Sequence, residues 1–102
     1  MSGKRPRATR RLAERAARKL VRDRERLFLL SPGGSPERPI EVSSSSVIEV
    51  RVRNSPCAQC EGAYQIREHA AVSAGLRRVD VLCRQCGAPR SLWFRIVPRE
   101  PN

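Results

Sequence analysis

The sequence contains few aromatic residues and little material for a large apolar core. Its 102 residues include one Trp, one Tyr and two Phe, and 39% of the residues are hydrophobic. The longest apolar run, Leu27 to Leu30, is far shorter than the roughly 20 residues that cross a bilayer. No apolar segment of signal-peptide length follows the basic N-terminus. We therefore expect a small fold, without a membrane span or secretory signal, in a reducing cytoplasmic environment.

Acidic residues are scarce relative to basic ones. Lys and Arg number 21 against 10 Asp and Glu, which gives a net charge of +11 at pH 7. Lys4 and Lys19 are the only lysines, so nearly all of the basic groups are guanidinium groups, which bind phosphate in a bidentate manner. This charge favours a polyanionic partner and argues against a neutral metabolic enzyme.

Residues suited to catalysis do not form any familiar motif. The sequence has no Ser/His/acid set, no Gly-rich phosphate loop and no pair of carboxylates in apolar surroundings. His69 is the only histidine, and we expect it to be a surface or cross-strand residue. The sequence therefore predicts a protein that is not an enzyme and that has no small-molecule substrate.

Charge and composition divide the chain into three parts. Residues 1–30 hold eleven basic and three acidic residues, whereas residues 31–102 hold ten and seven. Three prolines and two glycines between Ser31 and Pro39, followed by the Ser43–Ser46 run, interrupt regular structure. We predict a basic helical segment over 1–30, a linker over 31–46 and a compact domain over 47–102.

The segment from Ala8 to Leu30 is predicted to be an amphipathic helix. It has no Gly or Pro and is rich in Ala, Leu, Arg and Glu, which favour helix. One side carries Leu12, Leu20 and Leu27, which we call the leucine face. The other side carries a row of arginines that we call the basic stripe: Arg11, Arg15, Arg18, Arg22 and Arg26. Like charges four residues apart repel, so an anionic partner or packing on the C-terminal domain is expected to stabilise the helix.

The basic stripe is compatible with more than one function. Arginines in this arrangement bind the phosphates of nucleic acid, but they also solubilise tails and helices that dock on other proteins. Binding to a membrane surface is disfavoured because Ala supplies half of the apolar side and no Trp is present to anchor it.

Alternation of apolar and polar residues predicts four short strands. They lie at Ile48–Val52, at Tyr64–Ala70, at Val79–Val81 leading into the second cysteine pair, and at Leu92–Ile96. Ala74-Gly75 supplies a turn between the middle two. Ser46-Val47-Ile48-Glu49 also fits a helix capping box, but the Val-rich run that ends at Pro56 favours a strand.

Two C-x-x-C pairs carry the strongest chemical signal. Cys57-Ala58-Gln59-Cys60 and Cys83-Arg84-Gln85-Cys86 are separated by 22 residues. Two residues between cysteines let a tight turn aim both sulfurs at one point, and two such turns complete a tetrahedron about Zn²⁺. Gly87 follows the second pair, where a positive φ closes such a turn, whereas Glu61-Gly62 follows the first. We predict one structural zinc ion held by Cys57, Cys60, Cys83 and Cys86.

Other uses of four cysteines fit the sequence less well. Two disulfides agree with the even cysteine count, but the close spacing and the expected reducing environment argue against them. A thioredoxin-like pair requires one C-x-x-C in a βαβ context, whereas two pairs occur here among strand patterns. A redox sensor that ejects zinc on oxidation is a further alternative, and nothing marks these cysteines as unusually reactive.

Residues 57–97 resemble a zinc ribbon. They show a cysteine turn, a strand pair, a second turn that ends in C-x-x-C-G, and a closing strand. The resemblance implies a small, mostly-β domain with a three- to four-stranded antiparallel sheet, here behind an N-terminal basic α-helix. The first turn departs from many zinc ribbons because it lacks both a Pro and an immediately following Gly. So small a domain buries little apolar area, and structural zinc supplies on the order of 10 kcal/mol, so metal is expected to be a condition of folding.

Zinc ribbons have diverse roles, so the function must be argued from the other residues. We predict a non-enzymatic zinc-ribbon, or zinc-finger, protein that binds DNA or RNA through the basic stripe. Trp93 and Arg95 share a strand face opposite Leu92 and Phe94, where they would stack on bases and contact phosphate. Trp93 has another interpretation, in which it covers the sheet or docks the N-terminal helix. The alternative function is a zinc-stabilised adaptor that joins proteins of a larger assembly through the leucine face.

Overall fold

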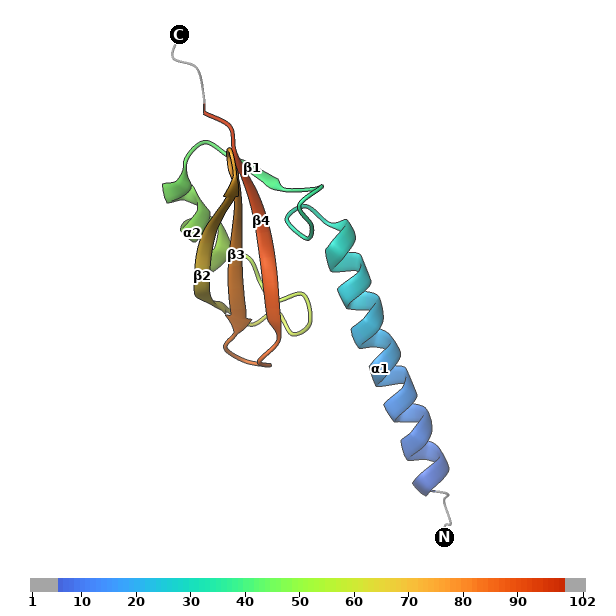
Figure 1. Cartoon of the computed structure of the whole chain (residues 1–102). Helices are drawn as coiled ribbons and strands as arrows, with labels where there is room; N and C mark the ends of the chain where they lie inside the picture. Colours follow the sequence, from blue (N-terminus) through green and yellow to red (C-terminus); the bar gives the residue numbers. More distant parts are fainter. Residues whose placement is uncertain (1–5, 99–102) are drawn as a thin grey trace.

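The computed structural model describes residues 6–98, so the terminal residues 1–5 and 99–102 of the predicted segments lie outside the described part. Its elements, in chain order, are α1 (Pro6–Leu30), β1 (Ile40–Val42), α2 (Ser45–Arg53), β2 (Tyr64–Ser73), β3 (Leu76–Cys83) and β4 (Pro89–Ile96). Figure 1 shows the long helix α1 beside a small sheet that carries α2 on one face. We call residues 40–97 the sheet domain.

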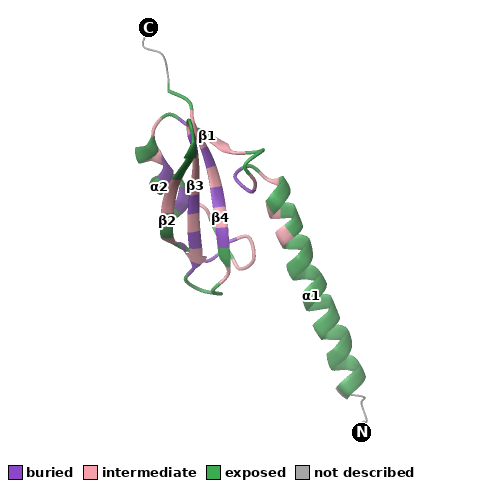
Figure 2. Ribbon diagram, in the orientation of Figure 1, coloured by how far each residue is buried: buried purple, intermediate pink, exposed green. Residues whose placement is uncertain are grey.

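Helix α1 confirms the helix predicted over Ala8–Leu30. Within residues 7–30 only Glu25 and Phe28 are half-buried, and all the other side chains are exposed (Figure 2). A helix of 25 residues is about 37 Å long, and its N-terminal end extends past the sheet (Figure 1). Leu12 and Leu27 are 65% and 66% exposed, so α1 does not pack on the sheet domain through its leucine face. No helix within residues 6–98 has the length and apolarity of a membrane span.

The sheet has the order β1-β4-β3-β2. Strands β2 and β3 form an antiparallel hairpin whose turn contains Gly75 at φ 78°, as predicted, and β3 and β4 are also antiparallel. Strand β1 is parallel to β4, with Ile40 opposite Phe94, so the prediction of a purely antiparallel sheet is wrong at this edge. With three residues directly after Pro39, β1 is too short to produce a detectable alternation.

The strand predicted at Ile48–Val52 is also wrong, because these residues form helix α2. Ile48 and Val52 are fully buried, whereas Val50 between them is 51% exposed. This burial follows the spacing of four residues on a helix face and not the alternation of a strand. The helix begins after Ser44, so the serine run starts it two residues before the capping box at Ser46. Burial of these two side chains against the sheet therefore overrides the β-propensity of the valines.

The core lies between α2 and one face of the sheet. Its fully buried side chains include Phe94 of β4, Val79 of β3, and Ile48 and Val52 of α2. Buried and less buried positions alternate along β4 and along β3 from Val79 onward, so one face of these strands lies toward the core (Figure 2). The opposite face carries polar and half-buried side chains.

The segment between α1 and β1, which was predicted as part of a linker, forms a hydrogen-bonded turn. Gly33 has φ 85°, its N–H donates to Arg38 O at 2.6 Å, and its carbonyl accepts from Trp93 N at 2.9 Å. Gly34 lies so close to the end of α1 that a Cβ would stand 1.9 Å from Phe28 O. These contacts tie the C-terminal end of α1 to β4, and β1 itself also lies within residues 31–46.

Alanine substitutions in α2 test the helical packing directly. We expect Ile48→Ala to lower the free energy of unfolding by about 2–4 kcal/mol, because it leaves a cavity in the core. Val50→Ala is expected to change it by less than about 0.5 kcal/mol, because Val50 is exposed. Chemical unfolding of the metal-loaded protein measures both values. Equal losses at the two positions would instead support a strand with both side chains on one face.

Candidate metal centre and basic surface

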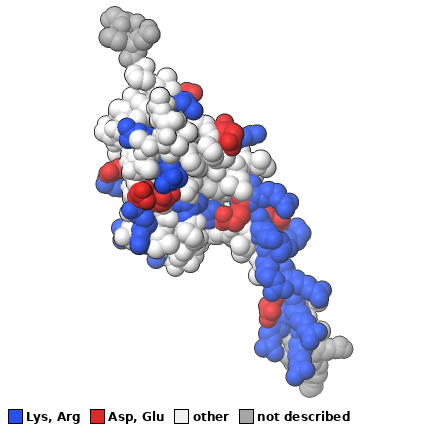
Figure 3. Space-filling view, viewed as in Figure 1, with Lys and Arg blue, Asp and Glu red and all other residues white. Residues whose placement is uncertain are grey.

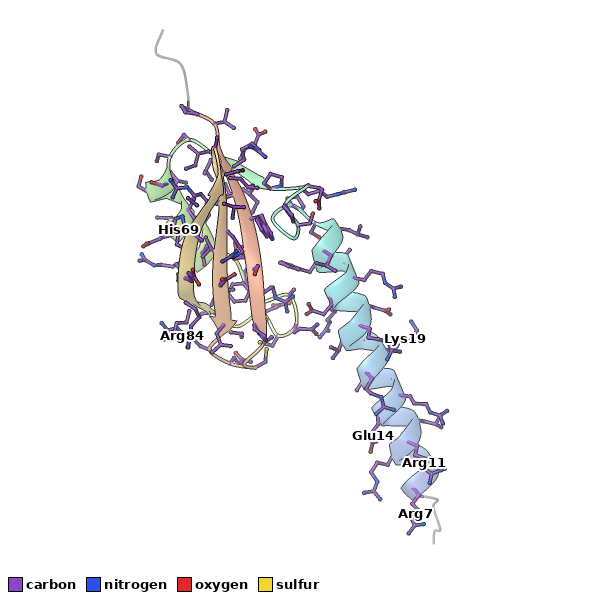
Figure 4. All side chains as sticks on the ribbon, in the orientation of Figure 1. Arg7, Arg11, Glu14, Lys19, His69 and Arg84 are labelled. Atoms are coloured by element: carbon purple, nitrogen blue, oxygen red, sulfur yellow. The ribbon has the colours of Figure 1, made fainter. Side chains whose placement is uncertain are left out.

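Each C-x-x-C pair forms a turn at the end of the sheet where β3 ends and β4 begins, and the sulfur atoms gather there in Figure 4. In the first cysteine turn, residues 57–62, Cys57 N donates to Gly62 O at 2.9 Å and Glu61 N donates to Cys57 O at 2.8 Å. In the second cysteine turn, residues 83–88, Cys83 N donates to Ala88 O and Gly87 N donates to Cys83 O, both at 3.0 Å. The two turns thus have the same hydrogen-bond pattern.

The residues after the two pairs explain how the first turn closes without a glycine at the expected position. Gly87 has φ 78°, as predicted, and the equivalent residue of the first turn, Glu61, adopts the same left-handed conformation at φ 64°. Gly62 is needed for a different reason. A Cβ at this position would stand 2.7 Å from Gln85 Cβ and 3.1 Å from Cys83 Sγ. Gly62 therefore allows the two cysteine turns to approach each other.

The four cysteine sulfurs form one compact cluster. All four Sγ atoms lie within 4.8 Å of one another. The Cys57 and Cys86 sulfurs are 3.8 Å apart, and those of Cys60 and Cys83 are 3.4 Å apart. A metal ion bound tetrahedrally at 2.3 Å from each sulfur places the sulfurs about 3.8 Å apart. The predicted ligands Cys57, Cys60, Cys83 and Cys86 are therefore positioned to bind one metal ion.

Backbone N–H groups point at three of these sulfurs. Gln59 N lies 3.4 Å from Cys57 Sγ and Gly62 N lies 3.4 Å from Cys60 Sγ. Gln85 N and Cys86 N approach Cys83 Sγ at 3.3 and 3.4 Å. These donors favour the thiolate form, which is the form that binds metal.

The thiols affect one another strongly. The N–H of Cys86 is the main reason that the pKa of Cys83 falls to about 6, against the opposing effect of burial. At Cys60, the N–H of Gly62 lowers the pKa, but burial and the three neighbouring sulfurs outweigh it and raise the pKa to about 12. Four thiolates so close together require a cation to balance their charge. The donor set thus fits a metal ion that prefers soft ligands.

Three basic residues of the sheet domain, His69, Arg84 and Arg90, have different environments. His69 lies on β2 away from the sulfurs, where Nε2 is 3.4 Å from Arg77 Nη1 (Figure 4). Arg84, in the second cysteine turn, is exposed. Arg90 is buried, but its guanidinium group is paired with a carboxylate of α1.

This pairing forms a helix anchor that the sequence analysis missed. Arg90 Nη1 and Nη2 each donate to one carboxylate oxygen of Glu25, both at 2.6 Å, and the Arg90 guanidinium lies 4.6 Å from the centre of the Phe28 ring. Gln59 Nε2 donates to Glu25 Oε2 at 2.6 Å. We use "helix anchor" for Glu25, Phe28, Gln59 and Arg90.

In the ion pair of the helix anchor, the arginine is buried from solvent and the glutamate is partly exposed. The Arg90 side chain is 3% exposed, whereas that of Glu25 is 42% exposed. Arg90 is the main cause that holds the pKa of Glu25 below its usual value of 4.5, with a further contribution from Gln59 and in opposition to burial. Glu25 is charged at neutral pH, and because its pKa is lowered, the stability that the pair contributes is lost only as the pH falls from the usual range of a glutamate through the lowered value.

The basic stripe lies on the solvent-exposed surface of α1, and all five of its arginines are exposed. Arg18 has one weak ion pair with Glu14 at 3.9 Å, and the other four make no ion pair with a carboxylate of the described residues. Figure 3 shows Lys and Arg covering much of α1, and Figure 4 shows Arg11 and Lys19 pointing away from the sheet domain. The result is a continuous positive surface.

Trp93 and Arg95 lie on the sheet face opposite the core, as predicted. They alternate along β4 with Leu92 and Phe94, whose side chains are buried in the core. Both are half-buried, and Trp93 is opposite Arg78 of β3. The backbone N–H of Trp93 binds Gly33 O, so this residue helps to hold the turn that follows α1. These two residues thus belong to β4, whereas the basic stripe belongs to α1.

Comparison of the chain with protein-family models, curated proteins and solved structures found no match.

Exchanging the residues that follow the two cysteine pairs tests the turn geometry. We expect Gly87→Ala to destabilise the metal-loaded protein by about 1 kcal/mol, because an added Cβ meets nothing within 4 Å and only the left-handed backbone is penalised. Glu61→Gly is expected to stabilise the protein, since it removes the same penalty. Chemical unfolding of the zinc-loaded variants gives both changes. A loss of stability in Glu61→Gly would contradict the equivalence of the two turns.

Proposed function

We propose that this chain is a zinc-ribbon protein, without enzymatic activity, that binds nucleic acid through the basic stripe of α1. The observation that carries the proposal is a row of exposed arginines on a helix that is held in place beside a four-cysteine metal site. The metal site supplies a stable platform, and the helix supplies the binding surface.

Zinc is the metal that best suits this donor set. It favours tetrahedral coordination by thiolates, and sites with four cysteines are typical of structural zinc. Four protein ligands fill the coordination shell, so the ion has no open position at which to activate water. The core of the sheet domain contains only a small set of fully buried side chains, among them Phe94, Ile48 and Val79. Binding of zinc, which contributes on the order of 10 kcal/mol, compensates for this small core.

The basic stripe suits a polyanion for two reasons. Arginines three or four residues apart lie about 4.5–6 Å apart along the axis and repeat on one side of α1. Pairs such as Arg11/Arg15 and Arg22/Arg26 repel each other, and phosphates remove this repulsion while releasing their own counterions. Trp93 and Arg95 form a second candidate surface, which would contact unpaired bases from the open face of the sheet.

The exposed leucine face favours a second candidate function, that of an adaptor between proteins. Leu12 and Leu27 are about two-thirds exposed on the side of α1 opposite the basic stripe. In this case the arginines keep the protein soluble, and a partner covers the leucines. Replacement of Leu12 and Leu20 by Gln distinguishes the two functions, because it removes an apolar docking face and retains every arginine.

Salt dependence tests the nucleic-acid proposal. If each of the five arginines of the basic stripe neutralises one phosphate of duplex DNA, the logarithm of the association constant falls with the logarithm of salt concentration with a slope of about −4.5. Replacing Arg11, Arg15 and Arg22 by Ala should bring this slope about 3 units closer to zero. Fluorescence anisotropy with a labelled 20-base-pair duplex, made as DNA and as RNA, measures the slopes.

A charge-matched variant provides the control. Replacing the exposed sheet-domain residues Arg51, Arg53 and Arg67 by Ala removes the same net charge but leaves the basic stripe intact, so the slope should stay near its original value. Equal effects of the two triple variants would indicate a response to net charge alone. That result, or no binding to either duplex at low salt, would contradict the proposed function.

A further inference from the structure

Helix α1 is attached to the sheet domain at one end only. In the described residues, hydrogen bonds from α1 to the sheet domain involve Val21, Arg24 and Glu25, and Phe28 packs against the core beside them. The part of α1 before Val21 extends away from this contact (Figure 1). The helix anchor therefore determines the direction in which the basic stripe points.

One residue of the anchor belongs to the metal site itself. Gln59 lies between the ligands Cys57 and Cys60, and its backbone N–H points at Cys57 Sγ. Its side-chain amide donates to Glu25 Oε2 at 2.6 Å and to Val21 O at 3.0 Å. Its backbone carbonyl oxygen accepts a hydrogen bond from Arg24 Nη1 at 2.7 Å. Gln59 thus contacts a candidate metal ligand through its backbone and α1 through its side chain.

The remaining anchor contacts depend on the same carboxylate. Glu25 Oε2 accepts hydrogen bonds from both Gln59 and Arg90. Arg90 is buried, and its Nε has no hydrogen-bond partner in the described residues, so Glu25 is the carboxylate that balances its charge. A displaced first cysteine turn would move Glu25 and leave Arg90 as a buried charge with a weakened partner, which is costly.

We propose that metal binding and the docking of α1 are coupled, with Gln59 as the positioning residue that links them. The metal fixes the first cysteine turn, the turn places Gln59, and Gln59 together with Arg90 holds Glu25. By thermodynamic reciprocity, docking of α1 strengthens metal binding by the same factor by which metal strengthens docking. The occupancy of the metal site then sets the orientation of the basic stripe. This inference rests on the metal site of the proposed function and is independent of nucleic-acid binding.

The two cysteine turns provide a matched pair of variants. Gln59 and Gln85 occupy the same position of each C-x-x-C pair, and each directs its backbone N–H at the preceding cysteine sulfur. Substitution by Ala leaves both backbone donors in place. Gln59→Ala removes a side chain that binds α1, whereas Gln85→Ala removes an exposed side chain of the second turn. Glu25→Ala breaks the anchor from the helix without altering either turn, and Glu14→Ala is its control on the same helix.

The measurements are the dissociation constant of Zn²⁺, from competition with a chromophoric chelator, and amide hydrogen exchange of residues 21–28 in the zinc-loaded protein. We expect Gln59→Ala and Glu25→Ala each to raise the dissociation constant about 5-fold or more and to speed exchange in α1. The two controls should change it by less than about 2-fold. The double variant should lose less affinity than the sum of the two single variants, because both substitutions remove the hydrogen bond between Gln59 and Glu25.

Two results would overturn the inference. One is a Glu25→Ala protein whose hydrogen exchange shows a released helix while its zinc affinity stays unchanged, since docking and metal binding would then be independent. The other is an equal loss of affinity in Gln59→Ala and Gln85→Ala, which would reflect general damage to the turns. A chain that binds no zinc at all would contradict the proposed metal site itself, and it is recognised in the unsubstituted protein before any variant is compared.

Discussion

The fold depends on the convergence of four sulfur atoms from two turns that are distant in sequence. Cys57 and Cys60 precede the β2–β3 hairpin, Cys83 is its last residue and Cys86 follows it, so a metal ion bound by all four would close the open end of this hairpin. The close approach imposes two local requirements. Gly62 must lack a side chain, and the residues after each pair must adopt a left-handed conformation. The N–H of Cys86 lowers the pKa of Cys83, whereas burial and the neighbouring sulfurs raise the pKa of Cys60 against the N–H of Gly62. A metal ion bound by the four sulfurs would balance their charge and would hold the two cysteine turns together at the base of the sheet.

The helix anchor extends this order to a part of the chain with no core of its own. Helix α1 has no fully buried side chain within residues 7–30, and its leucines remain exposed. A bidentate ion pair, a guanidinium–aromatic contact and the amide of Gln59 hold it instead. Such charged contacts are directional, so they fix the helix orientation more strictly than a small apolar patch would. A surface of exposed arginines is thereby presented in one direction from the sheet domain.

Local features of the sequence predicted the metal ligands and helix α1, because C-x-x-C spacing and helix periodicity involve neighbouring residues. The prediction failed at α2, where the β-propensity of Val50 and Val52 hid a spacing of four residues between Ile48 and Val52 that only the packed core makes clear. The helix anchor joins residues 65 apart, which no local pattern reveals. Two signals were nevertheless present. Glu25 is the one acidic residue of the predicted helix with no basic residue four positions away, and strand alternation places Arg90 on the buried face with Leu92.

The central claim is that one metal ion bound by the four cysteines holds the sheet domain together, and the intact mass of the protein tests this most directly. The chain is purified under reducing conditions without chelator, weighed by native mass spectrometry, and then treated with EDTA while circular dichroism follows the sheet. We expect the mass of the chain plus one zinc ion, and loss of the sheet signal as the metal is removed. A metal-free mass, together with a sheet signal that survives prolonged chelation, would contradict it.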